Sequence, residues 1–375
     1  MSLVPKDMEE MQHPEAVVKI ANENPAVALL ALKTPVYGDD PNELIKHRFL
    51  YRGGILLLSG PTGAGKSSFT MQWGISLAAG VACFGMKVGD RYYQKGLKVL
   101  VIQAENDEGD LAEQRDGVVS VFHPELIERA GRNLSFISMP DAAGEVFAAR
   151  LSALCEFHAP DIVFIDPVFS FLGGDNSAQK DVSHWVRNLL LPIMKRFNCS
   201  CVLIHHQNKP QKDAVNAGAY SMSGSAEWAN AARACLNLEA VGNGVFKLTA
   251  TKRGDRLGWR DDAEQKTLVR YIAHHGGTDE GGRAIIAWRE ASIDEVPQAH
   301  GKGRGSKVTV QDVVKALRGR GSLATADLQK IVEEDTGAAR SPVMERIGEA
   351  VQLGLVEPMR MGKRMFYSLS QEAGK

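Results

Sequence analysis

Short apolar runs alternate with amphipathic segments over most of the chain. The runs predict strands at 55–59, 98–104, 134–139, 161–166 and 201–206. Apolar residues at helical spacing predict helices at 66–79, 109–121, 144–158 and 178–197. Strands of this kind that are separated by helices are typical of a mainly parallel sheet covered on both faces. Three later runs, 245–251, 267–273 and 284–290, predict antiparallel strands added at one edge.

The pattern divides the chain into four parts. Residues 1–48 are expected to form an N-terminal arm, and residues 49–294 an α/β domain. Residues 295–306 are rich in glycine and basic residues and bury almost nothing, so they predict a linker. Residues 307–375 predict three helices and a hairpin, which is the plan of a winged helix.

Composition narrows the class of protein. The 375 residues carry a formal net charge of −1, so any contact with nucleic acid must come from local patches. The five cysteines form no CxxC pair, which indicates reduced core thiols rather than disulfides. Cys199 and Cys201 could in principle bind a metal, but their apolar strand favours a place in the core. The first residues are not a signal peptide, and the run at 26–32 is too short to span a bilayer, so we expect a cytoplasmic protein without membrane contact.

The strongest chemical signal is the segment Gly60-Pro61-Thr62-Gly63-Ala64-Gly65-Lys66-Ser67, and we expect these residues and the following Ser68 to bind the nucleotide. It matches the full pattern of a P-loop, with an apolar strand before it and an amphipathic helix after it. Glycines let backbone N–H groups wrap phosphates. Lys66 is expected to place a cation on the β- and γ-phosphates of ATP, and Ser67 to offer its hydroxyl to Mg²⁺.

Two acidic residues follow predicted strands. Asp166 ends the run DIVFID, and we expect this strand beside the P-loop, where the carboxylate would help to hold Mg²⁺. Glu105 follows VLVIQA and is a candidate base for the water that attacks the γ-phosphate, with Asp107 as its competitor. Each could also be a solvated turn residue.

Two further clusters are candidates for signalling between sites. His206, in the run HHQNK, is a candidate sensor of the γ-phosphate. Alternatively, it is a histidine of the core or a metal ligand. Adjacent strand residues point to opposite faces, so His205 and His206 do not easily share one ion. Lys252, Arg253 and Arg256 follow a late strand, where one of them could act on a neighbouring subunit or all could be a solvated basic turn.

Three segments are candidates for nucleic-acid contact. The loops 173–181 and 208–225 follow strands of the expected site. Lys209 and Lys212 of the second loop could contact a nucleic-acid backbone. The same sequence also fits a mobile surface loop. Residues 301–375 contain 13 Lys and Arg against 9 Asp and Glu. Arg360, Lys363 and Arg364 cluster at the expected hairpin.

The ordered set of P-loop, strand-end Glu, strand-end Asp, histidine strand, long loop and Lys-Arg pair resembles the RecA-like P-loop ATPases. Within that group, the phrase HRFLYRGGILLLSGPTGAGKSSFTMQ and the pair in HHQNK are similar to hexameric replicative helicases of the RepA plasmid and phage type. The resemblance covers roughly residues 40–290. The core of this family does not require a C-terminal winged helix, so the resemblance assigns no role to that module.

The resemblance implies a RecA-like core that binds ATP and Mg²⁺, assembles as a homo-oligomer, a hexameric ring in this family, and acts on single-stranded DNA. It assigns phosphate and metal binding to Lys66, Ser67 and Asp166, catalysis to Glu105, and sensing to His206. Lys252 or Arg253 would reach the neighbouring site. The alternatives are a non-motor ATPase of the RadA or KaiC kind, and an initiator or adaptor that binds DNA through the winged helix.

Overall fold

The computed structural model describes residues 26–36, 38–207, 226–292, 294–296, 308–336, 340–361 and 364–370. The chain forms two compact units, Met1–Val296 and Pro297–Lys375. None of the helices in these described stretches is long and apolar enough to cross a membrane.

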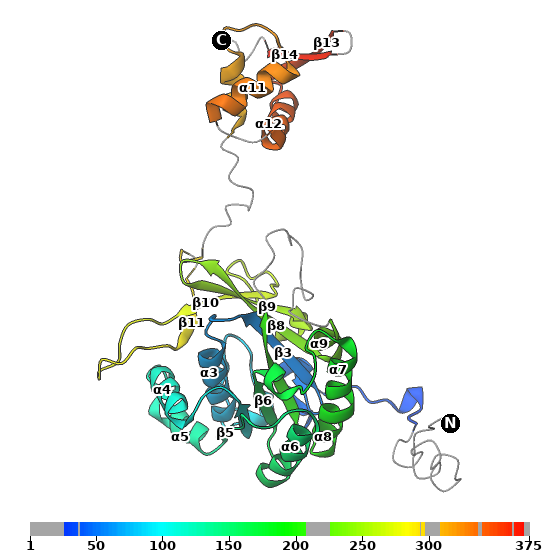
Figure 1. Ribbon diagram of the computed structural model, residues 1–375, viewed down its shortest axis with the longest axis vertical. Helices are drawn as coiled ribbons and strands as arrows, with labels where there is room; N and C mark the ends of the chain where they lie inside the picture. Colours follow the sequence, from blue (N-terminus) through cyan, green and yellow to red (C-terminus); the bar gives the residue numbers. More distant parts are fainter. Residues whose placement is uncertain are drawn as a thin grey trace. The chain divides into compact units, whose positions relative to one another are not determined.

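The first unit is built on a sheet of nine strands in the order β11-β10-β9-β8-β3-β7-β6-β4-β5 (Figure 1). Their bounds are β3 Ile55–Pro61, β4 Val99–Gln103, β5 Leu134–Ser138, β6 Ile162–Asp166, β7 Ser200–Gln207, β8 Ala234–Gly242, β9 Val245–Lys252, β10 Val269–His274 and β11 Trp288–Glu290. The six strands from β8 to β5 run parallel, whereas β9, β10 and β11 are joined antiparallel. The expected mainly parallel sheet with an antiparallel edge is therefore confirmed.

Two details of the sheet differ from the expectation. Strand β8 was not predicted, and it lies directly beside β3. Strand β6 is not the neighbour of β3, because β7 lies between them. Asp166 is therefore two strands away from the P-loop strand, although the carboxyl ends of all these parallel strands meet at one edge.

Helices cover both faces of the sheet (Figure 1). Helices α3 Lys66–Ala79, α4 Glu108–Val119 and α5 Pro124–Gly131 belong to one face. The other face is covered by α6 Gly144–His158, α7 Gln179–Ser183, a π-helical segment His184–Leu190, α8 Leu191–Arg196 and α9 Glu227–Ala231. The predicted helix at 178–197 is thus one helical stretch with a π segment in its middle.

Each face has its own hydrophobic core, which explains the apolar strands. The core on the α3 face contains alternate residues of β3, such as Leu56 and Leu58, and the aromatic rings of Phe69 and Trp73. The other core contains Ile55 and Leu57 with Trp185. All five cysteines are buried free thiols, and Cys199 and Cys201 belong to this second core.

The predicted boundary between an arm and the α/β domain, at residues 48 and 49, does not follow the packing. Strand β1 Glu43–Ile45 pairs with β2 Leu50–Tyr51. Leu44 and Ile45 are fully buried in the core on the α3 face. Residues 43–51 are therefore part of the packed α/β structure, because Leu44 and Ile45 bury their side chains in its core.

The second unit contains helices α10 Val310–Leu317, α11 Thr325–Thr336 and α12 Arg340–Gln352. Its antiparallel sheet has the order β12-β14-β13, from strands Leu323–Ala324, Arg364–Leu369 and Val356–Met361. Thr309 caps α10 by accepting from the N–H of Asp312, whose carboxylate accepts from Thr309 in return. Val313, Leu328 and Ile347, one from each helix, meet in a separate core.

Candidate nucleotide site

The P-loop joins β3 to α3 in the conformation that its glycines allow. Gly63 and Gly65 have φ angles of 77° and 76°, in the left-handed region that favours glycine. Helix α3 begins at Lys66, directly after Gly65. The unpaired backbone N–H groups of the first helical turn therefore lie at the carboxyl edge of the sheet, which is a favourable position for phosphates.

The ammonium group of Lys66 is buried within this loop, with only 4 % of the residue exposed. Its Nζ donates to the carbonyl oxygens of Gly60 and Pro61, at 2.9 and 2.8 Å. Burial lowers the pKa of Lys66 to about 8, while the charges of Asp166 and Glu105 oppose that shift. The structure thus brings these three predicted residues close enough to interact electrostatically.

The two predicted metal ligands also meet. Ser67 and Asp166 line the same small hollow, together with Gln103 and Asn106. A hydroxyl and a carboxylate are oxygen ligands of the kind that Mg²⁺ prefers, so the residues fit this ion. Burial raises the pKa of Asp166 to about 7, the charge of Glu105 adds to the shift, and Lys66 opposes it.

This shift predicts how stability depends on pH. The pKa of Asp166 is about 7 in the fold, against an ordinary value of about 3.9, so folding favours the protonated form. The buried carboxylate therefore lowers the free energy of unfolding. This loss of stability is absent below about pH 4 and complete above about pH 7. Without Mg²⁺ and nucleotide, Asp166→Asn should therefore raise the free energy of unfolding by about 2–4 kcal/mol at pH 8 and leave it nearly unchanged at pH 4. Urea unfolding at the two pH values checks this, and a gain independent of pH would contradict it.

The loop that carries Glu105 is held by a residue that the sequence patterns did not single out. The buried side chain of Gln103 accepts from the backbone N–H groups of Glu105 and Asn106, at 3.0 and 2.6 Å. It also donates to the carbonyl of Asn106. Asp107, the competitor of Glu105, caps α4 by accepting from Asp110 at 2.8 Å. This structural bond favours Glu105 as the residue left to act on water.

The two histidines of β7 face opposite sides, as their adjacency predicts. His205 is 1 % exposed and packs against Trp228 in the second core. His206 is half-buried, contacts Phe169, and has its pKa lowered to about 4 by burial and then by the charge of Lys66. No cluster of three potential metal ligands among His, Cys, Asp and Glu occurs in the described part of the chain. His206 is therefore close enough to Lys66 to feel its charge, and its sensor role stays a prediction.

Strand β11 packs onto the P-loop helix through a contact that the patterns did not predict. The backbone N–H of Trp288 donates to Gln72 at 2.6 Å, and Gln72 donates back to its carbonyl at 2.8 Å. The indole of Trp288 donates to Ser68, which itself bonds to Gly65. His274 and Trp288 lie so near Gly65 that a Cβ there would be 2.8 Å from each ring. The Ser68 hydroxyl, predicted to bind nucleotide, is thus engaged within the protein.

The basic cluster after β9 lies toward the other end of the sheet. In the strand register, Lys252 of β9 lies opposite Cys235 of β8, and Cys235 lies opposite Leu57 near the start of β3. Its Nζ donates to the carbonyls of Ala229 and Ala232, at 2.9 and 2.6 Å, where α9 ends. Lys252 therefore has a structural role within its own chain.

A substitution of Lys252 separates this structural role from a role in a neighbouring site. Lys252→Met keeps the aliphatic stem but removes the donors, so it should lower the free energy of unfolding by about 1.5–3 kcal/mol. The ATPase rate of the folded protein should stay close to that of the wild type. Unfolding and ATPase measurements on the same preparations test both statements. A stable variant that has lost activity would favour the neighbouring-site role.

Arg253 and Arg256 are held less tightly. Arg253 donates to the carbonyl of Arg48 at 3.2 Å, and its guanidinium lies 5.3 Å from the centre of the Tyr51 ring. Arg256 donates to the carbonyl of His47 at 2.9 Å. Neither forms an ion pair with a described carboxylate, and both lie away from the P-loop of their own chain.

Several predicted contact residues fall outside the described residues. These are the loop 208–225 with Lys209 and Lys212, and Lys363 of the C-terminal hairpin; the side chain of Arg364 is not described either. Of the other predicted loop, Asp175 accepts from Ser177, and its neighbour Asn176 accepts from the indole of Trp228 at 2.8 Å.

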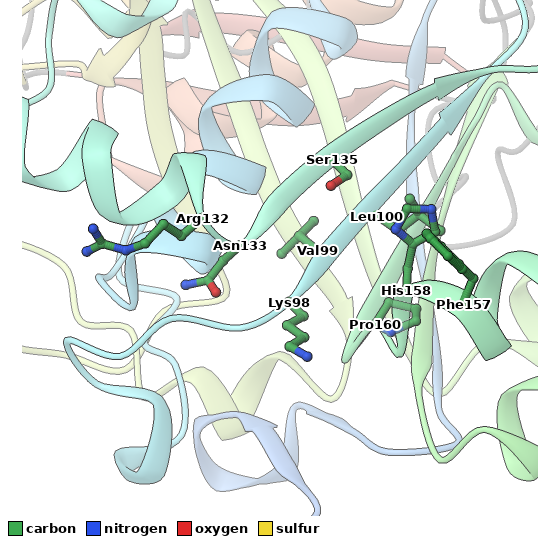
Figure 2. Close-up of a pocket in the computed structure, with 9 residues that line it drawn as sticks. All are labelled: Lys98, Val99, Leu100, Arg132, Asn133, Ser135, Phe157, His158 and Pro160. Carbon is green, nitrogen blue, oxygen red and sulfur yellow. The ribbon is translucent and has the colours of Figure 1, made fainter.

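Another hollow, of about 260 Å³, lies at the amino ends of β4 and β5 (Figure 2). Lys98, Val99 and Ser135 line it from the strands, and Phe157 and His158 from the end of α6. This is the edge opposite to the P-loop, so the hollow is separate from the nucleotide site.

Comparisons with known proteins agree with this geometry. Residues 35–212, just under half of the chain, match the family model described as "AAA domain". The match covers the P-loop and the strands β3, β4, β5, β6 and β7, and it supports the interpretation of the first unit as a P-loop ATPase fold. P-loop ATPases generally use ATP and Mg²⁺, and the assignment of Lys66, Ser67 and Asp166 as the residues that hold them stays a prediction.

No curated protein matches the chain. Among solved structures, that of the RadB recombinase aligns over 59 % of this chain and 87 % of its own, with 13 % identity and a TM-score of 0.38. A likeness at this score carries no inference about the activity of the first unit.

Proposed function

We propose that the protein is an ATP-driven motor on single-stranded DNA, a replicative helicase of the RepA type that works as a homo-oligomeric, hexameric ring. The observation that supports this most is the arrangement of charges in the first unit. Lys66, Glu105 and Asp166 interact at the carboxyl edge of the sheet. Arg253 and Arg256 lie toward the opposite end, where they cannot serve their own site but are available to a neighbour.

In this proposal, each group of the site has one task. Bound Mg²⁺ would supply positive charge to the phosphates and be held by Ser67 and Asp166. Lys66 exchanges its bonds to two loop carbonyls for bonds to phosphate oxygens. Glu105, held by the Gln103 side chain, accepts a proton from the attacking water. His206 donates to or accepts from the γ-phosphate region and, through β7, couples it to the segment that follows.

The C-terminal unit is proposed to be a winged helix that contacts DNA. Its elements follow the order helix, short strand, helix, helix and two-stranded hairpin. Residues 301–375 carry four more Lys and Arg than Asp and Glu. A local positive charge of this kind favours phosphate backbones when the chain as a whole is nearly neutral.

The test combines three measurements on the full chain. Size-exclusion chromatography with light scattering, with and without ATP and single-stranded DNA, reports the assembly. ATPase rates and displacement of a labelled strand from a forked duplex report the activity. We expect DNA-stimulated hydrolysis and ATP-dependent strand displacement, and Lys66→Ala should lose both. Displacement that survives Lys66→Ala would rule the motor out.

The same assays distinguish the alternatives. Hydrolysis without strand displacement would favour a non-motor ATPase. An initiator or adaptor is favoured by one observation, which is that the C-terminal unit has a core of its own. Footprinting on duplex DNA, with the full chain and with a chain ending at residue 296, tests it. Sequence-specific protection that needs the second unit supports an initiator, whereas uniform binding that salt abolishes does not.

A further inference from the structure

A hollow of about 300 Å³ on the first unit is lined by basic side chains that the nucleotide site does not use. Lys46, His47, Lys87 and Arg270 surround it, together with Trp259 and Gly85. Trp259 belongs to the core on the α3 face, so the hollow opens beside that core. None of the residues that line it is part of the P-loop.

Two buried N–H donors in the walls have no acceptor. Trp259 is 2 % exposed, and its Nε1 has no hydrogen-bond partner among the described residues. The Nε of Arg270 is buried and likewise unpaired there. The Arg270 guanidinium lies 5.9 Å from the centre of the Trp259 ring. A buried donor without an acceptor costs about 1–3 kcal/mol, so the pair indicates an acceptor that a ligand supplies. Trp73 and Trp185 also have unpaired indoles, but neither of them lines this hollow.

Gly85 leaves open the space in front of these donors. A Cβ at this position would be 2.8 Å from Nε1 of Trp259 and 3.5 Å from an Nη of Arg270. Its φ of +73° also favours glycine. Any larger residue would therefore fill the space that an acceptor atom needs.

The charges around the hollow are only partly balanced. Lys46 pairs with Asp90 at 2.5 Å. Lys87 and Arg270 form no ion pair with a carboxylate in the described ranges. Two such cations with an added indole N–H complement a compact dianion, because a guanidinium and an ammonium both bind oxyanions strongly.

We propose that this hollow is a phosphate-binding site, separate from the P-loop. Strand β10, which carries Arg270, is three strands from β3, or roughly 14 Å at the usual strand spacing. The phosphate group could be a free dianion, which matches both cations, or a phosphodiester of a polynucleotide, which also presents non-bridging oxygens but only one negative charge. The proposal does not depend on the helicase function.

Fluorine NMR of the full chain labelled with 5-fluorotryptophan tests the proposal directly. The protein is saturated with ADP and Mg²⁺ first, so that phosphate does not report on the P-loop. The resonance of Trp259 is identified by its loss in Trp259→Phe. Adding inorganic phosphate at constant ionic strength should shift this resonance to saturation, while that of the core residue Trp185 stays in place.

Variants then separate the site from a general charge effect. Arg270→Gln should weaken phosphate binding by about 10–100-fold, as expected for a lost charged hydrogen bond. Lys87→Gln, at an exposed position, should weaken it several-fold and is a second test if Arg270→Gln fails to fold. Arg196→Gln removes an exposed arginine elsewhere and should change nothing.

The source of the phosphate follows from a parallel titration with an oligothymidylate. Equal saturable shifts with both probes indicate a nucleic-acid contact, and a shift with inorganic phosphate alone indicates a small-anion site. The proposal is overturned if neither probe shifts the Trp259 resonance, if sodium chloride reproduces the shift, or if Arg270→Gln and Lys87→Gln both bind phosphate as the wild type does.

Discussion

Replacing Glu105 with glutamine should lower the rate of ATP hydrolysis by about 10²–10⁴-fold, the range of a lost general base, while nucleotide binding stays near its wild-type level. The amide keeps the shape of the side chain but cannot accept a proton from water. Gln103 holds this loop by its backbone N–H groups, so the loop itself should not move. Steady-state ATPase assays and binding of a fluorescent ATP analogue measure the two quantities.

Asp107→Asn is the matched control for this substitution. Asp107 caps α4, and asparagine is an equally good cap, so both fold and activity should persist. If Asp107→Asn abolishes hydrolysis and Glu105→Gln does not, the assignment of the base is reversed. A Glu105→Gln variant that also fails to bind nucleotide would indicate a role in assembling the site instead.

The parts of the fold that local patterns encode could be predicted. A short window of sequence is enough to predict the P-loop strand and the helix after it. The same holds for the strands that lead to Asp166 and Glu105. Parallel strands place their carboxyl ends at one edge, so residues distant in sequence were expected to gather there. The electrostatic contact of Lys66 with Glu105 and Asp166 agrees with that expectation.

Contacts between distant residues could not be predicted in the same way. Gln72 and Trp288 are 216 positions apart, and nothing in either local sequence signals their paired hydrogen bonds. The place of β8 beside β3 likewise depends on pairing across the chain. Leu44 and Ile45 form an apolar run too short to distinguish an arm from a packed strand.

The structure gives different surroundings to two basic residues that the sequence motif could not distinguish. Lys252 and Arg253 are adjacent, yet the carbonyls at the end of α9 engage only the lysine. Arg253 has φ of 58° and donates instead to the carbonyl of Arg48, so the two adjacent side chains have different partners. Of the two, the arginine is the better candidate for an action on another subunit.

Arg253→Ala should lower ATP hydrolysis by about 10³–10⁵-fold, the contribution of an arginine that stabilises the transferring phosphoryl group from a neighbour. The expectation rests on the proposed ring, because Arg253 lies away from the P-loop of its own chain. Its present contacts, one carbonyl and the Tyr51 ring, are weak enough to be exchanged. Arg256→Ala is the comparison, since Arg256 has the same charge and a similar single bond to the η2 segment Lys46–Arg48.

Mixing inactive variants shows whether the residue acts on a neighbour. An interface that takes its P-loop from Arg253→Ala and its arginine from Lys66→Ala contains every wild-type group. In a head-to-tail ring of the two variants in equal amounts, up to about a quarter of the interfaces are of this kind. ATPase activity should therefore reappear on mixing, although each variant alone is inactive. If the mixture stays inactive while light scattering shows mixed rings, Arg253 supports its own chain, and no arginine at this position completes the neighbouring site.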